Sequence, residues 1–365
     1  MREMFIKVIL LASAFLFFIT GTSCSSDSAT SEQEKEYDMS GFAKGADVSW
    51  LTEMEHDGVK FYNQKGKAEE CMTLLRDLGT NAIRLRVWVN PDGGWCGKED
   101  VVKKARRAQQ LGFRLMIDFH YSDTWADPAH QTVPAAWQGY TAEQMKQALA
   151  DHTKDVLTAL KDKGVTNVEW VQVGNETRDG MLWNDAESDD AKAVTGRVSE
   201  NAANFAAYVN AGYDAVKAVY PQAKVIVHVD EGNNLGRYTW LFGELKKNGG
   251  KWDVIGMSLY PEDNNWQDLT TNCLNNIKTL SEQYNCNVII SEIGMWWGSD
   301  QAAPMMKKMV DGCKAISTCE GIFYWEPEVY NNWKPANYTT LGWSAYTKGA
   351  FDNSGKPTAV FDSYK

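Results

Sequence analysis

Residues 170–176, with the sequence WVQVGNE, form an apolar, strand-like run that ends in the pair Asn175 and Glu176. A second run, NVIISE at residues 287–292, has the same design and ends in Glu292. An ionised carboxylate beside apolar neighbours must be desolvated or must change its pKa, so a buried strand ends in Glu only at a cost. One such strand is equally well explained by a structural Glu–Arg pair. Two in one chain indicate carboxyls that work together.

Further along the chain in both directions, eight apolar or β-branched runs alternate with amphipathic, helix-like stretches. The predicted strands are residues 45–50, 82–89, 114–120, 168–176, 224–230, 254–260, 288–292 and 321–326. The predicted helices include residues 67–78, 99–111, 142–163, 201–219 and 268–284. Eight strand–helix units in succession predict an α/β fold of the parallel (β/α)8 type, the TIM barrel, in a single domain.

Polar and aromatic side chains gather where the predicted strands end. In a (β/α)8 barrel the C-terminal ends of the strands carry the catalytic residues. A lone His or Trp on a strand is usually an ordinary core residue, but the same feature on eight strands is hard to explain by packing. The residues at these ends are Asp47, Trp50, Arg86, Trp88, His120, Asp123, Trp125, Asn175, Glu176, His228, Asp230, Tyr260, Glu292, Trp325 and Glu326.

The two glutamates point to hydrolysis of glycosidic bonds. This chemistry needs one protonated and one ionised carboxyl that face each other across the bond. The chain also has 15 Trp and 15 Tyr in 365 residues, and proteins that bind sugars use such rings as platforms for the apolar face of a pyranose. The candidate platforms are Trp88, Trp125, Trp296, Trp297, Trp325 and Trp333.

The N-terminus is predicted to be a targeting segment. Arg2 and Lys7 precede an uncharged apolar run at residues 8–20, which is shorter than the roughly 20 residues of a membrane-spanning helix. Residues 1–23 are therefore predicted to be an export signal of the lipoprotein type. Residues 24–40 are rich in Ser and acidic residues and are predicted to be a flexible tether. Residues 41–365 remain as one catalytic domain.

Cys24, at the junction of signal and tether, resembles the lipidated cysteine of bacterial lipoproteins. The usual Leu three positions earlier is Gly21 here, and ordinary signal cleavage near Ser23 is the alternative. We therefore expect an exported outer-membrane lipoprotein at the cell surface, which contacts the membrane through its lipid anchor only.

The net charge of the chain argues against one class of partner. A formal net charge of −11 disfavours nucleic acid as a partner, whose binding needs clustered Lys and Arg.

The six cysteines after Cys24 can form disulfides in an exported protein, and two local pairs are predicted: Cys273 with Cys286, and Cys313 with Cys319. No Cys/His spacing suggests a zinc site. We expect a monomer.

Several segments resemble the endo-β-1,4-galactanases of glycoside hydrolase family 53, which belong to a large clan of retaining (β/α)8 glycosidases. The matching segments are GADVS (45–49), NAIRLRVWVNP (81–91), DFHYSDTWADP (118–128), VGNE (173–176), DVIG (253–256), SE (291–292) and YWEP (324–327). They span almost the whole predicted domain. The VGNE segment alone indicates the clan, whereas the first three segments indicate the family.

The resemblance implies that Glu176 is the general acid/base and Glu292 the nucleophile. It also implies that Asn175 bonds the sugar 2-hydroxyl. From charge and hydrogen bonding, we expect Arg86 and the phenol of Tyr260 to stabilise charge on Glu292. The full set of substrate-binding residues that it implies is Asp47, Arg86, Trp88, His120, Asp123, Asn175, His228, Tyr260 and Trp325.

The resemblance also implies the substrate, β-1,4-galactan from pectic side chains and its galacto-oligosaccharides, with no cofactor required. Some bacterial relatives carry a calcium site in the loop after strand seven, but residues 293–301 offer few hard oxygen ligands, so the loop does not support a structural calcium ion. Two alternatives stay open. One is another retaining enzyme of the clan, active on arabinogalactan or mannan. The other is a glycan-binding lipoprotein without catalysis, against which the presence of both glutamates argues.

Overall fold

The computed structural model describes residues 36–184 and 193–365. The predicted signal, Cys24 and most of the predicted tether therefore lie outside the described residues. Tyr37–Lys365 is one compact unit, which contains the whole of the predicted domain. Within the two described ranges, no helix combines the length and the apolar character that a membrane span needs.

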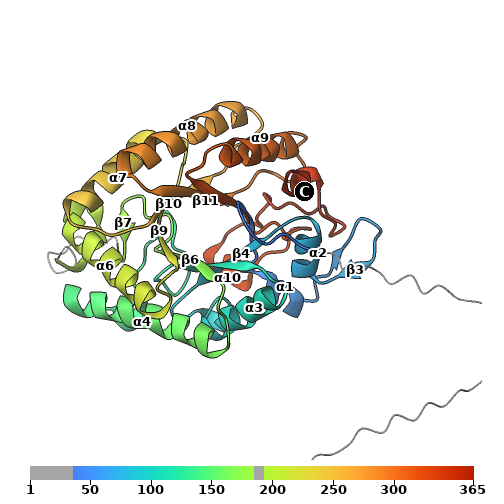
Figure 1. Ribbon diagram of the computed structural model, residues 1–365. Helices are drawn as coiled ribbons and strands as arrows, with labels where there is room; N and C mark the ends of the chain where they lie inside the picture. Colours follow the sequence, from blue (N-terminus) through green and yellow to red (C-terminus); the bar gives the residue numbers. More distant parts are fainter. Residues whose placement is uncertain (1–35, 185–192) are drawn as a thin grey trace, which may run out of the picture. The chain divides into compact units, whose positions relative to one another are not determined.

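Eight parallel strands close into a barrel, with helices around the outside (Figure 1). The prediction of a (β/α)8 barrel is confirmed, and each predicted strand overlaps one strand of the barrel. In order around the barrel, these strands are β1 (Ala43–Asp47), β4 (Ala82–Val87), β5 (Arg114–Phe119), β6 (Val168–Val173), β9 (Lys224–Val229), β10 (Val254–Leu259), β11 (Asn287–Ile293) and β12 (Cys319–Trp325).

The main outer helices follow the strands and bury one face against them. They are α2 (Cys71–Asp77), α3 (Lys98–Gln110), α4 (Ala142–Asp162), α6 (Val198–Val219), α7 (Leu235–Lys247), α8 (Trp266–Tyr284) and α9 (Ala302–Lys314). Shorter elements are α1 (Leu51–His56), α10 (Ala336–Leu341), η1 (Asp92–Gly94), η2 (Ala135–Trp137), η3 (Ala359–Tyr364) and two small hairpins, β2 (Phe61–Tyr62) with β3 (Ala68–Glu69) and β7 (Gly180–Met181) with β8 (Gly196–Arg197).

The predicted helix at residues 67–78 is wrong at its start. Ala68–Glu69 pairs with Phe61–Tyr62 instead, and the helix begins only at Cys71. Glu70 explains the boundary, because its carboxylate accepts hydrogen bonds from two free backbone N–H groups of the first turn, at 3.0 and 2.6 Å. Such a cap ends the extended segment and starts the helix.

Alternation along the strands divides the barrel interior into an apolar lower layer and a polar upper layer. The lower layer takes one residue from each strand: Ala43, Ala82, Met116, Trp170, Ile226, Val254, Ile289 and Phe323. Residues two apart on a strand share a face. Arg84, Asp118, Gln172 and His228 therefore stand above Ala82, Met116, Trp170 and Ile226, and all four are fully buried. This register places the polar groups at the C-terminal mouth.

Glu292 would break this alternation, because it lies three positions after Ile289. The pairing of β10 with β11 contains a register shift: Met257 is opposite Ile290, but Ser258 is opposite Glu292. One extra residue in a strand is a β-bulge, which re-aims the side chains that follow it. The bulge turns Glu292 into the mouth of the barrel.

Both predicted disulfides are wrong, because all six cysteines of the described ranges are free thiols. Cys273 lies inside α8 and Cys286 follows its end, so a helical rise of roughly 16 Å separates them, more than a disulfide can span. Cys313 is buried against Cys319. Their hydrogen bond and their burial raise the pKa of the Cys313 thiol well above its usual value, which disfavours the thiolate that oxidation needs.

Candidate active site

A strained turn presents Glu176 after the end of β6. Gly174 has a φ of 84°, and a Cβ atom at this position would lie 2.7 Å from Thr177 Cγ2. Glu176 itself has a φ of 45°, a left-handed conformation that residues other than Gly seldom adopt. The turn is held by Thr177, whose N–H donates to the His228 carbonyl at 2.8 Å. Strain of this kind persists where the surrounding structure enforces it, typically at functional sites.

Glu292 is held by two groups that favour its ionised form. Arg84 Nη2 lies 2.9 Å from Glu292 Oε1, and the Tyr260 hydroxyl donates to Oε2 at 2.7 Å. Burial raises the pKa of Glu292, while Arg84 and Tyr260 oppose that rise. The carboxylate is thus oriented by two fixed donors and is suited to act as a nucleophile.

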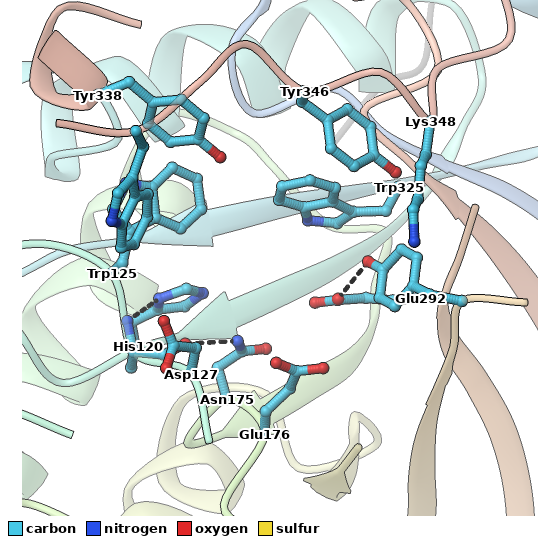
Figure 2. A pocket seen from close by; sticks show the side chains of 13 residues that line it. His120, Trp125, Asp127, Asn175, Glu176, Glu292, Trp325, Tyr338, Tyr346 and Lys348 are labelled. Carbon is cyan, nitrogen blue, oxygen red and sulfur yellow. Dashed lines mark hydrogen bonds between the residues drawn. The ribbon is translucent and has the colours of Figure 1, made fainter. Parts of the chain in front are cut away.

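Among the described residues, no cation is paired with Glu176 as Arg84 is with Glu292. Burial raises its pKa well above the usual range, and the nearby charges of Glu292 and Asp230 raise it further. Figure 2 shows the two carboxyl groups pointing into the same space, Glu176 from the bottom of the view and Glu292 from the right. Because the two environments differ, Glu176 is the group that keeps a proton when Glu292 is ionised.

The two carboxyls face a cavity of about 330 Å³ with a largely aromatic wall. Figure 2 shows Trp125 and Tyr338 on one side of it, and Trp325, Tyr346 and Lys348 on the other. Its lining consists of His120, Trp125, Ala126, Asp127, Asn175, Glu176, Tyr260, Glu292, Trp325, Tyr338, Trp343, Tyr346 and Lys348. Flat apolar rings beside a few fixed polar groups are the usual composition of a small-ligand site.

Asn175 is locked in place in the lining of this cavity. Its Oδ1 accepts hydrogen bonds from Arg84 Nη2 and Gln172 Nε2, each at 3.0 Å, and its Nδ2 donates to the Ala126 carbonyl at 2.7 Å. An amide nitrogen carries two hydrogens, so one of them is left for a ligand.

The structure brings six of the predicted site residues together around the cavity. They are His120, Asn175, Glu176, Tyr260, Glu292 and Trp325. The other five lie beneath or beside the cavity and do not line it. They are Asp47, Arg86, Trp88, Asp123 and His228.

The five residues outside the lining contact protein groups. Asp47 binds Arg84 at 2.6 Å, and Arg86 binds Glu326. The indole N–H of Trp88 donates to His120 Nδ1 at 3.3 Å. Further paired groups are Asp123, which accepts from the N–H groups of Asn90 and Ala135, and His228, which contacts Ser258 Oγ and Asn175 Oδ1.

Arg84, rather than Arg86, is the cation that contacts Glu292. Arg84 is fully buried and also binds Asp47 at 2.6 Å and Asp118 at 2.9 Å. The stabilisation of charge on Glu292 that was expected from Arg86 therefore comes from Arg84. Both arginines occur in the run 82–87 and share a face of β4, so the alternation that marks them as inward-facing does not decide between them.

Sequence reasoning missed most of the aromatic wall that follows β12. Tyr338, Trp343, Tyr346 and Lys348 all line the cavity, but residues 342–348 lie outside the regular helices and strands. A segment of this kind has no periodicity to interpret. Asp127 was also missed, although it lies within one of the family-like segments.

A metal site finds no support in the described residues. Across residues 36–184 and 193–365, no group of three or more His, Cys, Asp or Glu side chains is arranged to hold a metal ion. The loop after β11 instead exposes Trp296, which lines a neighbouring cavity of about 470 Å³ together with Lys348. This loop does not supply the clustered carboxylates that calcium requires.

Comparison with known proteins gives a consistent family match. The family described as "Glycosyl hydrolase family 53" matches residues 43–305. The chain is 31% identical over 346 residues to an endo-beta-1,4-galactanase of Bacillus subtilis (strain 168), covering 84% of this chain and 75% of that protein. It is 29% identical over 338 residues to an arabinogalactan endo-beta-1,4-galactanase of Thermothelomyces thermophilus, covering 86% and 96%.

Solved structures agree with the sequence comparison. A structure described as one of two fungal beta-1,4-galactanases superposes with a TM-score of 0.76 at 27% identity, covering 89% of this chain and 99% of that chain. The catalytic domain of an Ignisphaera aggregans protein of the same family also has a TM-score of 0.76, at 26% identity, with 89% and 96% covered.

Proposed function

The chain belongs to glycosyl hydrolase family 53, and we propose that it is an endo-β-1,4-galactanase that cleaves pectic galactan and arabinogalactan with retention of anomeric configuration. The observation that carries this proposal is the pair of opposed carboxyls in unlike environments at the floor of an aromatic cavity. Hydrolysis of a β-glycosidic bond by a retaining route needs both groups.

In the first step, the ionised Glu292 attacks the anomeric carbon of a galactosyl unit. Glu176 gives its proton to the glycosidic oxygen, and the bond between that oxygen and the anomeric carbon breaks. The product is an ester between the sugar and Glu292. Arg84 and Tyr260, which hold the two oxygens of Glu292, keep the carboxylate aligned for this attack.

In the second step, the ionised Glu176 takes a proton from water while the water oxygen attacks the anomeric carbon. The ester bond breaks and Glu292 leaves as a carboxylate. Two inversions restore the original configuration, and for such a pair we expect the carboxyl groups to lie about 5 to 5.5 Å apart. Asn175 lines the cavity beside Glu176, so its spare N–H can bond the 2-hydroxyl of the sugar in both steps.

A panel of polysaccharides tests the substrate assignment. Purified protein should release reducing sugar from β-1,4-galactan, and less or none from mannan. Cleavage of mannan in preference to galactan would favour another specificity within the clan. Binding to galactan without any release of reducing sugar would favour the glycan-binding alternative. Product sizes larger than the monosaccharide at early times would support endo action. We also propose that the enzyme acts as a monomer.

We also propose that the enzyme works at the cell surface, held by a lipid on Cys24 and the tether of residues 24–40. The polar sequence of the tether supports this location, because a flexible arm would let the barrel reach a polymer too large to enter the periplasm. One acyl chain binds a membrane only reversibly, so stable anchoring takes more than one.

Replacement of the anchor residue should change location without changing catalysis. The Cys24→Ala variant should move from the membrane fraction to the soluble fraction and keep the parent's activity per mole, because the tether is separate in sequence from every residue of the site. Ser25→Ala is the matched control and should stay with the membrane. Persistence of Cys24→Ala in the membrane fraction would refute lipidation there. Activity that survives protease treatment of intact parent cells would place the barrel on the periplasmic side.

A further inference from the structure

Arg86 is buried among indole rings below the cavity. Its Cζ lies 4.2 Å from the centre of the Trp125 ring, 4.9 Å from that of Trp88 and 5.7 Å from that of Trp50. The side chain has no exposed surface. Trp is the best aromatic partner for a cation, and the attraction strengthens when both are removed from water. A planar guanidinium can also stack on a ring, which an ammonium cannot do.

Arg86 makes few hydrogen bonds, so the faces of its guanidinium are free to pack against the indole rings. Its Nη1 binds Glu326 Oε1 at 3.0 Å, and its Nη2 contacts Cys96 Sγ at 3.4 Å. Its Nε has no hydrogen-bond partner in the described part of the chain. Burial raises the pKa of Glu326, and the Oε2 of Glu326 also accepts a hydrogen bond from the Trp50 N–H at 3.2 Å. The ion pair is therefore one of several contacts around Arg86, and it leaves the faces of the guanidinium to the indole rings.

Trp125 connects the buried arginine to the cavity. It lines the cavity itself, and its ring packs edge-on or tilted against four other rings of the lining, at centroid distances of 5.6 to 6.2 Å. These rings belong to His120, Trp325, Tyr338 and Trp343. A change in the tilt of Trp125 would therefore be transmitted to much of the aromatic wall.

We propose that Arg86 is a positioning residue that never touches the substrate. Its planar guanidinium packs against Trp125 and holds this ring in place as a platform for galactosyl units. This role rests on the proposed function, because it takes the aromatic cavity to be the galactan site. It replaces direct substrate contact, which the complete burial of Arg86 prevents.

Two substitutions separate the plane of the guanidinium from its charge. Arg86→Lys keeps a cation for Glu326 but removes the planar group. Glu326→Gln removes the ion pair but keeps Arg86 over Trp125, and an amide has nearly the same shape as the carboxyl that it replaces. Arg107→Lys is the matched control, because Arg107 pairs with Glu55 and Glu70 at the surface of the barrel and is not in the cavity lining.

The readout is the dissociation constant for β-1,4-galactotetraose, measured by calorimetry in the inactive Glu176→Gln background. Adding Arg86→Lys should weaken binding about tenfold, less than the roughly thirtyfold of a whole desolvated cation–π contact, because Lys keeps the charge and loses only the planar group. Adding Glu326→Gln or Arg107→Lys should change the dissociation constant less than about twofold. In active enzyme, Arg86→Lys should raise KM with little change in kcat, and should alter the near-ultraviolet circular dichroism of the tryptophans.

Three outcomes overturn this role or its premise. Equal affinity in the Arg86→Lys and parent proteins would show that the guanidinium plane is not needed. Loss of affinity in Glu326→Gln as large as in Arg86→Lys would assign the effect to the ion pair. Should Arg86→Lys fail to fold, a tenfold loss of affinity in Glu326→Gln would still overturn the proposed role. Absence of any galactotetraose binding in the Glu176→Gln parent would instead contradict the proposed function.

Discussion

Replacing Glu292 with glutamine is expected to abolish galactan hydrolysis, with a fall in kcat on the order of 10⁴-fold or more, as for other essential nucleophiles. An amide cannot attack the anomeric carbon, so no ester forms. Glutamine has nearly the same shape, and its oxygen can still accept a bond from Arg84 or Tyr260, so the barrel should stay folded. The rate of reducing-sugar release from galactan measures the effect.

The matched control for this variant is Glu231→Gln. Glu231 is a half-exposed carboxylate of the neighbouring β9 loop that pairs with Arg178 and Arg237 and does not line the cavity. Its loss should leave kcat within about twofold of the parent, as for most surface substitutions. An aryl β-galactoside with a very good leaving group should fail to rescue Glu292→Gln, because the missing step is the attack itself. Near-normal turnover of galactan by Glu292→Gln would remove Glu292 from the role of nucleophile.

The second large effect is expected from Glu176→Gln. General acid catalysis contributes about 10²- to 10⁴-fold, and galactan has a poor leaving group, so kcat on galactan should fall by roughly this factor. A substrate whose leaving group needs no proton should form the ester with Glu292 at a much less affected rate. Rapid-quench measurement of the first turnover should then show a burst of released aglycone, because the second step still lacks its base.

The contrast between the two variants is what identifies the roles. If Glu176→Gln reduced the first turnover of an activated substrate as severely as that of galactan, Glu176 would not be the proton donor. If it left galactan hydrolysis almost unchanged, the interpretation of the turn after β6 would also be wrong. Melting temperatures of all variants, compared with the parent, show whether any loss reflects unfolding.

Much of the fold could be predicted because alternation and strand ends are local properties. The apolar runs mark the eight strands. Met116, Asp118 and His120 are two positions apart in turn and so face the same side of the strand, which places polar side chains above an apolar one toward the mouth. The acid/base residue could be predicted because the apolar run of β6 leads directly into Asn175 and Glu176. The final direction of the Glu176 side chain depends on the turn after β6, where Gly174 has a φ of 84° and Glu176 a φ of 45°, and alternation along the strand does not contain this turn.

The direction of Glu292, the identity of its cation and the state of the cysteines could not be predicted, because they depend on how the chain packs in three dimensions. The bulge at Ser291 is needed to turn Glu292 inward, and regular alternation alone would direct that side chain outward. Arg84 and Arg86 have equivalent positions in the pattern, and only three-dimensional contacts show that Arg84 meets Glu292. The pairing of Cys313 with Cys319 looked favourable by spacing, but proximity in a buried core produced a thiol contact without a covalent bond.

The most direct test of the central claim, a retaining pair formed by Glu176 and Glu292, is proton NMR of galactan during its first minutes of hydrolysis by the parent enzyme. Two successive displacements at the anomeric carbon predict that the new reducing ends appear first as the β anomer, with the α anomer growing later by mutarotation. Appearance of the α anomer first would show a single displacement by water. That result would contradict a nucleophilic role for Glu292 and would require carboxyls about 6.5 to 9.5 Å apart.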